Sequence, residues 1–203
     1  MIQLATPIPR KVVVASSGGP DSQALLSFCR RGKKDITVLH IDHGTDHAKQ
    51  ARAHMEKYCA DHNLPLVVRE VPADTEHNEN VWREFRLECY REFTSKGIWL
   101  ATGHHAGDNL EWHLLTTIHG KPNFMRPRDE EHKLLKPFLL AEKEELIAWC
   151  ERFNVPYVND PTNIGQDNAR AKLRADVIPA LLNIHKGMKS SIRNKFKESI
   201  GVK

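Results

Sequence analysis

The sequence predicts an α/β fold in which a parallel, doubly wound sheet carries helices on both faces and is followed by a small C-terminal helical lobe. Short β-branched runs alternate with helical patterns over the first 119 residues, and the spacing between strands leaves room for crossover helices. The segments that follow the predicted strands are rich in Gly, Asp, His, Ser or Thr. Ligands of such sheets lie beyond the carboxyl ends of the strands, so these segments are expected to form one site.

The predicted elements follow one another in regular order. Strands are expected at residues 11–16, 35–41, 66–71 and 98–102, and helices at residues 22–31, 46–62, 80–96 and 108–119. A loop or crossing segment is expected at residues 120–133, followed by the apolar stretch Leu134–Leu140, a helix near Glu142–Phe153, a turn around Asp160–Asn163 and a final helical stretch. We therefore divide the chain into an α/β domain, residues 1–133, and a helical lobe with a basic tail, residues 134–203.

Composition restricts the class of protein. With 203 residues, 40% hydrophobic content and a net charge of +4, the chain can bury one core, and its mild basic bias permits an RNA partner without requiring one. Pro7 and Pro9 interrupt the region where a signal peptide would be apolar, and no stretch approaches 18 apolar residues. The four cysteines form no Cys-x-x-Cys pair and are expected to be buried free thiols. We expect a cytoplasmic protein without a membrane segment.

The most informative motif is Ser16–Ser22, which joins the first predicted strand to the first predicted helix. Its two glycines let the backbone approach a ligand closely, and the first N–H groups of the following helix have no intrahelical partner. Together with the helix dipole these groups favour an anion, most naturally the phosphates of a nucleotide. The motif is not a Walker A loop, because no lysine is placed to reach the phosphates. The alternative is an ordinary strand–turn–helix corner.

A second candidate segment follows the fourth predicted strand. If a helix starts near Ala106, Asp108 and Glu111 are three residues apart and share one face. Two carboxylates there can hold Mg²⁺ or an incoming ammonium group and can later accept its proton. The alternative is that Asp108 caps the helix and that Glu111 lies at the surface.

Asp42 and His43 follow the second predicted strand and are expected to line the nucleotide pocket. His43 and His47 also have the spacing of a zinc-binding pair, but no Cys cluster or His-Glu-x-x-His motif accompanies them.

Basic residues offer further anion contacts. Arg83 and Arg86 lie on one side of the helix expected at residues 80–96, where they can bind phosphate or RNA, although a surface salt bridge between Glu79 and Arg83 is an equally simple reading. Arg170 and Arg174 are one helical turn apart and form a cationic face that suits either phosphates or solvent.

The order and spacing of these motifs resemble the tRNA(Ile)-lysidine synthase family of PP-loop ATP pyrophosphatases, from about Lys11 to Leu182. The matching segments are Ser17–Ser22, His40–Gly44, Ala101–His105, Asp108 with Glu111, Arg83 with Arg86, Asp160–Asn163, and Arg170–Arg174 followed by Val177–Pro179. The last two segments discriminate best, because many ATP pyrophosphatases share the PP-loop.

The resemblance implies a Rossmann-like fold and a two-step ligase reaction. ATP would adenylate the C2 oxygen of the wobble cytidine in a tRNA(Ile) with a CAU anticodon, and the ε-amine of free lysine would displace AMP to give lysidine. The implied ATP-binding residues are Ser17, Gly18, Gly19, Pro20, Asp21, Ser22, Asp42, His43, Gly103 and His104. The implied catalytic residues are Asp21, Asp108, Glu111 and Arg83, with Mg²⁺ at Asp21 and Asp108, and the implied tRNA contacts are Arg86, Arg170, Lys172 and Arg174.

The sequence departs from the family pattern in three ways. Gly107 stands where the family usually has the first of two adjacent aspartates, and Lys136, Lys143 and Lys172 stand at positions often occupied by arginine. Longer family members continue into further tRNA-binding domains. Two alternatives therefore stay open: another PP-loop adenylating enzyme, acting in tRNA thiolation or small-molecule amidation, and a non-catalytic nucleotide- or RNA-binding relative. Formation of a homodimer is also left open.

Overall fold

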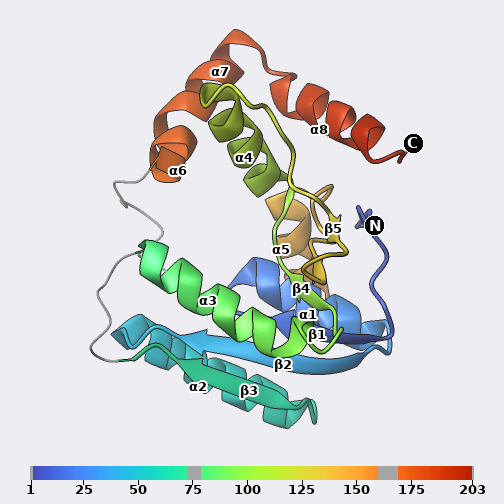
Figure 1. Cartoon of the computed structure of the whole chain (residues 1–203), viewed down its shortest axis with the longest axis vertical. Coiled ribbons are helices and arrows are strands. Elements are labelled where there is room, and N and C mark those ends of the chain that lie inside the picture. Colours follow the sequence, from blue (N-terminus) through green and yellow to red (C-terminus); the bar gives the residue numbers. More distant parts are fainter. Residues whose placement is uncertain (1, 73–78, 160–168, 203) are drawn as a thin grey trace.

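The computed structural model describes residues 2–72, 79–159 and 169–202 (Figure 1). Its centre is a six-stranded sheet with the strand order β3-β2-β1-β4-β6-β5. The strands are β1 (Lys11–Ala15), β2 (Asp35–Asp42), β3 (Leu66–Glu70), β4 (Leu100–Thr102), β5 (Arg128–Asp129) and β6 (Leu134–Leu135). All neighbouring strands pair in parallel except β5, which runs antiparallel to β6. The expected α/β, Rossmann-like fold is thereby confirmed.

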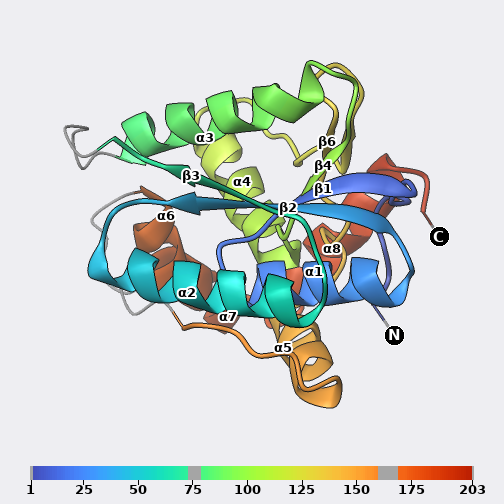
Figure 2. The ribbon, with the colours of Figure 1, turned by 90° about the horizontal axis from the view of Figure 1, so that it is seen from below.

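Helices cover both faces of this sheet. The helical elements are α1 (Pro20–Arg31), α2 (Asp46–Asp61), α3 (Glu79–Thr94), α4 (Ala106–Ile118), α5 (Lys143–Arg152), α6 (Ala169–Lys172), the π-helical turn η2 (Leu173–Val177), α7 (Ile178–Ile184) and α8 (Met188–Ser199). Figure 2 shows α1 and α2 on one face of the sheet and α3 on the other. Helix α5 packs on α1, and the elements α6, η2 and α8 pack against α4. Within the described residues, no helix is long and apolar enough to cross a membrane.

The alternation of buried side chains in the strands explains the two layers of helices. In β1, Val12 and Val14 face α1 and α2 and join the larger core, whereas Val13 joins the opposite cluster with Leu100 of β4 and Cys89 of α3. A strand that is buried on both sides needs a continuous apolar run, as parallel sheets generally do.

The sequence-based element boundaries agree with the structure to within two residues over the first 119 positions. The loop or crossing segment expected at residues 120–133 also contains a short strand, β5, that the sequence did not indicate. Strands β5 and β6 have two residues each, which is too short for a periodic pattern. The turn expected at Asp160–Asn163 lies outside the described residues. The division of the chain at residue 133 stays a prediction.

The strand order reverses between β1 and β4, which places a crevice at their carboxyl ends. The chain leaves β1 into the Ser16–Ser22 motif and leaves β4 into Gly103. A Cβ atom at Gly103 would lie only 2.9 Å from the backbone of Asp21 and Ser22. Because that contact is with backbone rather than with a flexible side chain, only glycine lets the end of β4 pack directly against the first turn of α1.

We expect Gly103→Ala to lower the free energy of unfolding by about 3 kcal/mol, because α1 or β4 must move to admit the methyl group. Gly97 is the comparison, since a Cβ there meets nothing within 4 Å and only its φ of +74° disfavours alanine. Gly97→Ala should cost about 1 kcal/mol. Urea denaturation of both variants measures the difference, and equal losses would show that the contact at Gly103 is loose.

Candidate functional site

The loop after β1 is held in shape by its own serines. Ser16 Oγ donates a hydrogen bond to Ser22 Oγ (3.1 Å), and Ser22 Oγ donates to the Gly19 carbonyl (3.0 Å). Gly18 has a φ of +87°, which favours glycine, and its carbonyl accepts a hydrogen bond from the Val158 N–H (2.9 Å). The loop is therefore a fixed support for the start of α1.

Among the described residues, no side chain caps the N-terminus of α1. Its N-cap residue is Gly19, and Pro20 occupies the first turn. By contrast, the N-cap side chains of α2 and α4, Thr45 and His105, each accept a hydrogen bond from a first-turn N–H. The first N–H groups of α1 thus remain available, and with the helix dipole they form an anion site at the carboxyl end of β1.

Asp21 lies beside this helix start and faces Lys143 and His105. Its Oδ2 atom is 3.7 Å from Lys143 Nζ and 3.9 Å from His105 Nε2. Its Oδ1 atom is buried and has no hydrogen-bond partner within the part of the chain that the structure describes. Burial raises the pKa of Asp21 although His105 and Lys143 both act to lower it. A buried carboxylate oxygen without a partner is a candidate ligand for a cation.

The two carboxylates of α4 have different roles. Asp108 Oδ2 accepts the His105 backbone N–H at 2.9 Å, so the capping role considered for it is present. The alternative of a surface position for Glu111 is not supported, because its side chain is only 7% exposed, and its catalytic role stays a prediction. Both Glu111 oxygens accept hydrogen bonds from Arg174, at 2.7 and 3.0 Å.

Arg170 and Arg174 lie against α4. Arg174 forms the forked ion pair with Glu111, and the Arg170 guanidinium lies 5.8 Å from the Trp112 ring centroid. Both arginines of the expected cationic face therefore contact α4, although the Arg174 side chain is still 55% exposed. Lys172 lies between them and is exposed. A contact of these residues with tRNA stays a prediction.

His104 lies next to the loop and is kept neutral. Its Nδ1 atom is 2.7 Å from Thr102 Oγ1. Burial, together with the nearby Lys136 and Arg170, lowers the pKa of His104 to about 4. Burial also lowers the pKa of Lys136, the residue that follows β6 at the same edge of the sheet.

Asp42 ends β2 and His43 follows it, so both lie at the carboxyl edge of the sheet. Asp42 is buried and accepts the Gly44 N–H at 2.9 Å, so its carboxylate stabilises the turn. The His43 ring packs on Trp82 of α3, with the ring centroids 5.0 Å apart. Burial and the nearby Arg86 lower the pKa of His43. His43 and Trp82 together present an aromatic surface at the carboxyl end of β2.

Arg83 is exposed and lies 3.7 Å from the Glu84 carboxylate. The side chain of Glu79, the partner considered from the sequence, is outside the described residues. The structure thus brings Asp21 and Asp108 together with His105, whereas Arg83 lies outside this cluster in the recorded contacts.

Sequence reasoning missed three residues of the site. His105, Lys136 and Lys143 were noticed as part of a motif or as substitutions, but none was assigned a role. His105 immediately precedes α4, Lys136 immediately follows β6, and Lys143 begins α5. The signal that could have found them is this position, since any polar residue at the carboxyl edge of the sheet faces the crevice.

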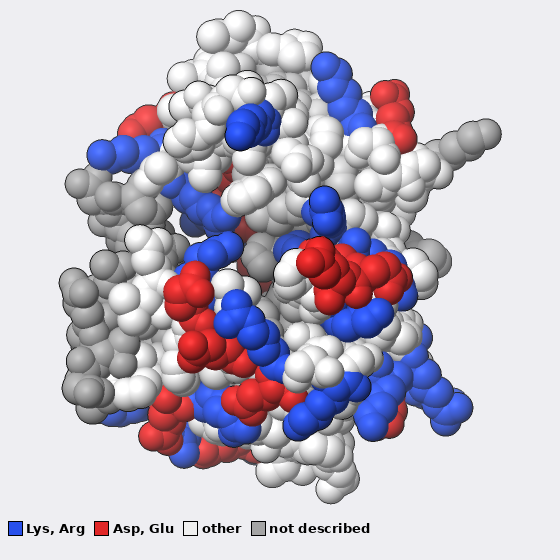
Figure 3. Space-filling view, in the orientation of Figure 1, with Lys and Arg blue, Asp and Glu red and all other residues white. Residues whose placement is uncertain are grey.

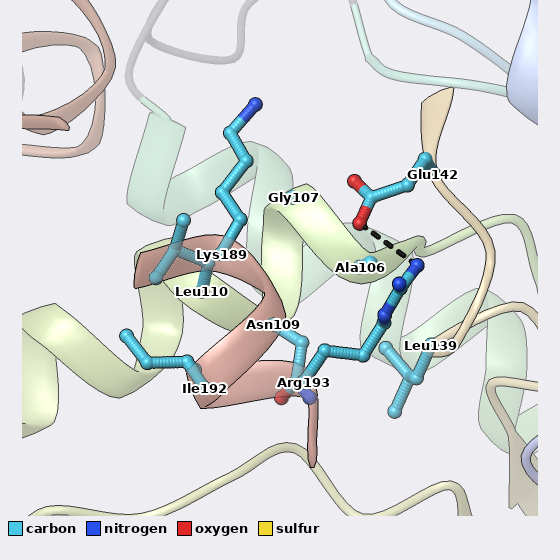
Figure 4. Close-up of a pocket in the computed structure, with 9 residues that line it drawn as sticks. All are labelled: Ala106, Gly107, Asn109, Leu110, Leu139, Glu142, Lys189, Ile192 and Arg193. Atoms are coloured by element: carbon cyan, nitrogen blue, oxygen red, sulfur yellow. Dashed lines mark hydrogen bonds and ion pairs between the residues drawn. The ribbon is translucent and has the colours of Figure 1, made fainter. Parts of the chain in front are cut away.

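A small pocket lies between the start of α4 and helix α8 (Figure 4). Its cavity volume is about 20 Å³, and it is lined by Ala106, Gly107, Asn109, Leu110, Leu139, Glu142, Lys189, Ile192 and Arg193. Glu142 and Arg193 form an ion pair of 3.2 Å across it. Arg193 Nε is buried and finds no partner in the described part of the chain. The pocket therefore offers one acidic group and two basic groups, and the acidic Glu142 lies beside the basic Arg193.

The charged surface around the crevice is mixed. Figure 3 shows this face hollowed between the helices at the top and the sheet below, with Lys and Arg side chains on both sides of the hollow. Such a distribution suits a polyanion that bridges the two parts.

We expect Arg174→Ala to destabilise the protein by about 1–2 kcal/mol, because it leaves the buried Glu111 carboxylate without its partner. Glu111→Gln in the same chain should recover part of this loss, since no buried charge then remains. Arg170→Ala is the control: its partner is an aromatic ring, and its loss should stay near 0.5 kcal/mol. Thermal denaturation of Arg174→Ala, Glu111→Gln, the double variant and Arg170→Ala measures the coupling. If the losses of Arg174→Ala and Glu111→Gln added strictly in the double variant, the pairing would be contradicted.

The comparisons agree with this geometry. A family model described as a PP-loop domain matches residues 3–181. The tRNA(Ile)-lysidine synthase of Nitratidesulfovibrio vulgaris is 32% identical over 91% of this chain and 58% of its own length. Those of Vibrio cholerae (30% identical, 88% of this chain) and Staphylococcus aureus strain COL (28%, 84% of this chain) are each matched over 44% of their length. The chain thus spans about half the length of the curated relatives it matches.

Solved structures support the fold. The U34-tRNA thiolase NcsA from Methanococcus maripaludis superposes with a TM-score of 0.69 at 17% identity, over 96% of this chain and 74% of the thiolase. The NH₃-dependent NAD synthetase from Campylobacter jejuni gives 0.53 at 14% identity, over 97% of this chain and 87% of the synthetase. The glycine loop after β1, the uncapped start of α1 and the family match over residues 3–181 together show that this chain belongs to the PP-loop domain family.

Proposed function

We propose that this chain performs the reaction for which its curated relatives are named, the formation of lysidine in tRNA(Ile). In the first step, the C2 oxygen of the wobble cytidine attacks the α-phosphorus of ATP, and pyrophosphate leaves. In the second step, the ε-amine of free lysine forms a bond to C2, the bond from C2 to oxygen breaks, and AMP leaves. The amine gives up a proton in this step.

The observation that carries the proposal is the uncapped N-terminus of α1 beside the glycine loop. Backbone N–H groups and the helix dipole there would hold the phosphates that leave as pyrophosphate. Lys143, at the start of α5, adds a positive charge next to Asp21. This arrangement stabilises a leaving group of high negative charge without a Walker lysine.

The donor set also fits Mg²⁺. Asp21 supplies a buried carboxylate oxygen without a partner in the described structure, and Asp108 supplies a second carboxylate nearby. Oxygen ligands of this kind are those that Mg²⁺ prefers. The ion would neutralise part of the charge on the ATP phosphates when it is bound.

The pocket of Figure 4 would receive the backbone end of free lysine once the Glu142–Arg193 ion pair across it opens. Glu142 offers a carboxylate to the α-ammonium group, and Arg193 offers a guanidinium to the α-carboxylate. Leu110 and Leu139 supply apolar contacts for the methylene chain. Gly107 lines this pocket and precedes Asp108, so a lysine held here would extend its ε-amine toward the carboxylates at the start of α4.

The tRNA would lie across the hollow of Figure 3. Arg86 of α3 and the segment from Arg170 to Arg174, in which Lys172 is exposed, would contact its phosphates. Because the curated relatives are about twice as long, selection of one tRNA by this chain is part of the proposal. Assembly into a homodimer is a further expectation, which size-exclusion chromatography with light scattering tests.

Thiolation is the less favoured alternative. All four cysteines are buried free thiols. Burial raises the pKa of Cys29 to about 12 and that of Cys59 and Cys150 to about 11, and it also raises the pKa of Cys89. A sulfur-transfer cysteine needs an accessible thiolate, which none of these positions provides.

We expect Asp21→Asn to reduce pyrophosphate release from ATP at least 100-fold, because the variant loses the charge that would face Mg²⁺. Asp46→Asn is the matched control, since Asp46 is also in the first turn of a helix but its side chain is 95% exposed. The assay contains the protein, ATP, Mg²⁺, bulk tRNA and labelled lysine, and circular dichroism confirms folding.

The same assay separates the functions. Lysine incorporated into tRNA by the parent protein supports lysidine formation. Release of AMP and pyrophosphate without lysine incorporation would indicate a different acceptor, and the absence of ATP turnover would indicate a non-catalytic relative. Unchanged pyrophosphate release by Asp21→Asn would contradict the placement of the phosphates.

We expect Arg193→Gln to raise the KM for lysine by about tenfold, which corresponds to the loss of one charge-assisted contact. The KM for ATP should stay unchanged, because Arg193 pairs with Glu142 and is not among the residues assigned to ATP. Lys195→Gln on the same helix is the control, since Lys195 is exposed and does not line the pocket. Equal effects of the two changes on the lysine KM would remove the pocket from the proposal.

A further inference from the structure

The side chain of His105 is held in one orientation at the start of α4. Its Nδ1 atom accepts a hydrogen bond from the Gly107 N–H at 3.0 Å, which caps the helix. A ring nitrogen that accepts a hydrogen bond carries no proton, so in the neutral ring the proton resides on Nε2. The cap therefore makes Nε2 a hydrogen-bond donor.

This donor faces two carboxylates from two different helices. His105 Nε2 lies 3.7 Å from Asp108 Oδ2 and 3.9 Å from Asp21 Oδ2, and the His105 side chain is only 12% exposed. Lys143 Nζ supplies a positive charge near Asp21, at 3.7 Å from the same oxygen. Without a donor between them, the negative charges of Asp21 and Asp108 repel each other.

Gly107 provides the space that the ring needs. A Cβ atom at this position would lie 2.6 Å from His105 Cε1 and 3.0 Å from Nδ1. Any larger residue at position 107 therefore forces the imidazole to leave its place above the first turn of α4. The identity of residue 107 and the orientation of His105 depend on each other.

We propose that His105 is a positioning residue that holds the Asp21 and Asp108 carboxylates toward one another, and that Gly107 is required because it makes room for the ring. This role rests on the proposed function, since the two carboxylates are the groups assigned there to Mg²⁺. It acts through the carboxylates, and it places no reacting atom on His105 itself.

The variant His105→Asn separates positioning from capping. Asparagine is a favourable N-cap, and its Oδ1 atom can take over the hydrogen bond from Gly107, but it carries no donor at the place of Nε2. We expect the melting temperature to stay within about 2 °C of the parent, because the cap is kept. The Mg²⁺ concentration that gives half of the ATP-dependent thermal stabilisation should rise at least fivefold.

His105→Gln is the conservative rescue, because its amide nitrogen reaches closer to the position of Nε2. It should restore most of the Mg²⁺ dependence while it lowers the melting temperature. Parent-like Mg²⁺ dependence of His105→Asn would overturn the proposal and leave His105 as a cap alone. These readouts need only ATP and Mg²⁺, so a parent protein that binds both but transfers no lysine would contradict lysidine formation without touching this inference.

A double-mutant cycle tests the dependence on Gly107. Gly107→Ala in the parent should raise the half-saturating Mg²⁺ concentration as His105→Ala does, because both displace the imidazole. In the His105→Ala background the same change should add less than a twofold effect, since the ring is already absent. Independent, multiplicative effects of the two changes would show that Gly107 does not act through His105.

Discussion

The contact between Gly103 and the first turn of α1 determines the geometry of the whole crevice, because two backbones meet there with no side chain between them. Strand β4 leads through this contact into α4, and the Ala106 N–H at the start of α4 donates to the Ala141 carbonyl just before α5. The N-termini of α1, α4 and α5 consequently converge at the switch point of the sheet. Three helix dipoles then favour negative charge in the same small volume.

That concentration of positive potential explains why carboxylates are tolerated there. Asp21 is partly buried, yet it has Lys143 and His105 beside it. Glu111 is more deeply buried and is neutralised by Arg174. The ion pair between Glu111 and Arg174 also joins the C-terminal helical elements to α4. The Glu111 carboxylate therefore contributes both to the charge near the crevice and to the packing of these elements.

The sequence is sufficient for the fold but not for the details of the site. Alternation of β-branched runs and helical patterns locates β1 to β4 and their helices, because those signals are local. The two-residue strands β5 and β6 have no such signal, since β6 depends on pairing with β4, and β5 on pairing with β6.

Among site residues, the loop at Ser17–Ser22 is readable because a glycine turn between a strand and a helix has few uses. The partner of Glu111 is not readable, since Arg174 lies 63 residues away and comes near only when η2 packs on α4. The meaning of Gly107 also needs coordinates. From the sequence, Gly107 indicates only that a carboxylate of the family pattern is absent. The structure shows that a side chain at position 107 would collide with the His105 ring.

The burial of all four thiols has a practical consequence for experiments on this protein. Cys29, Cys59 and Cys150 belong to the core between the sheet and α1, α2 and α5, whereas Cys89 belongs to the cluster under α3. A thiol reagent can react with each only after the corresponding side of the sheet has opened. The chain thus carries natural reporters of local opening on both faces of its sheet, and labelling rates would rank the two faces by their stability.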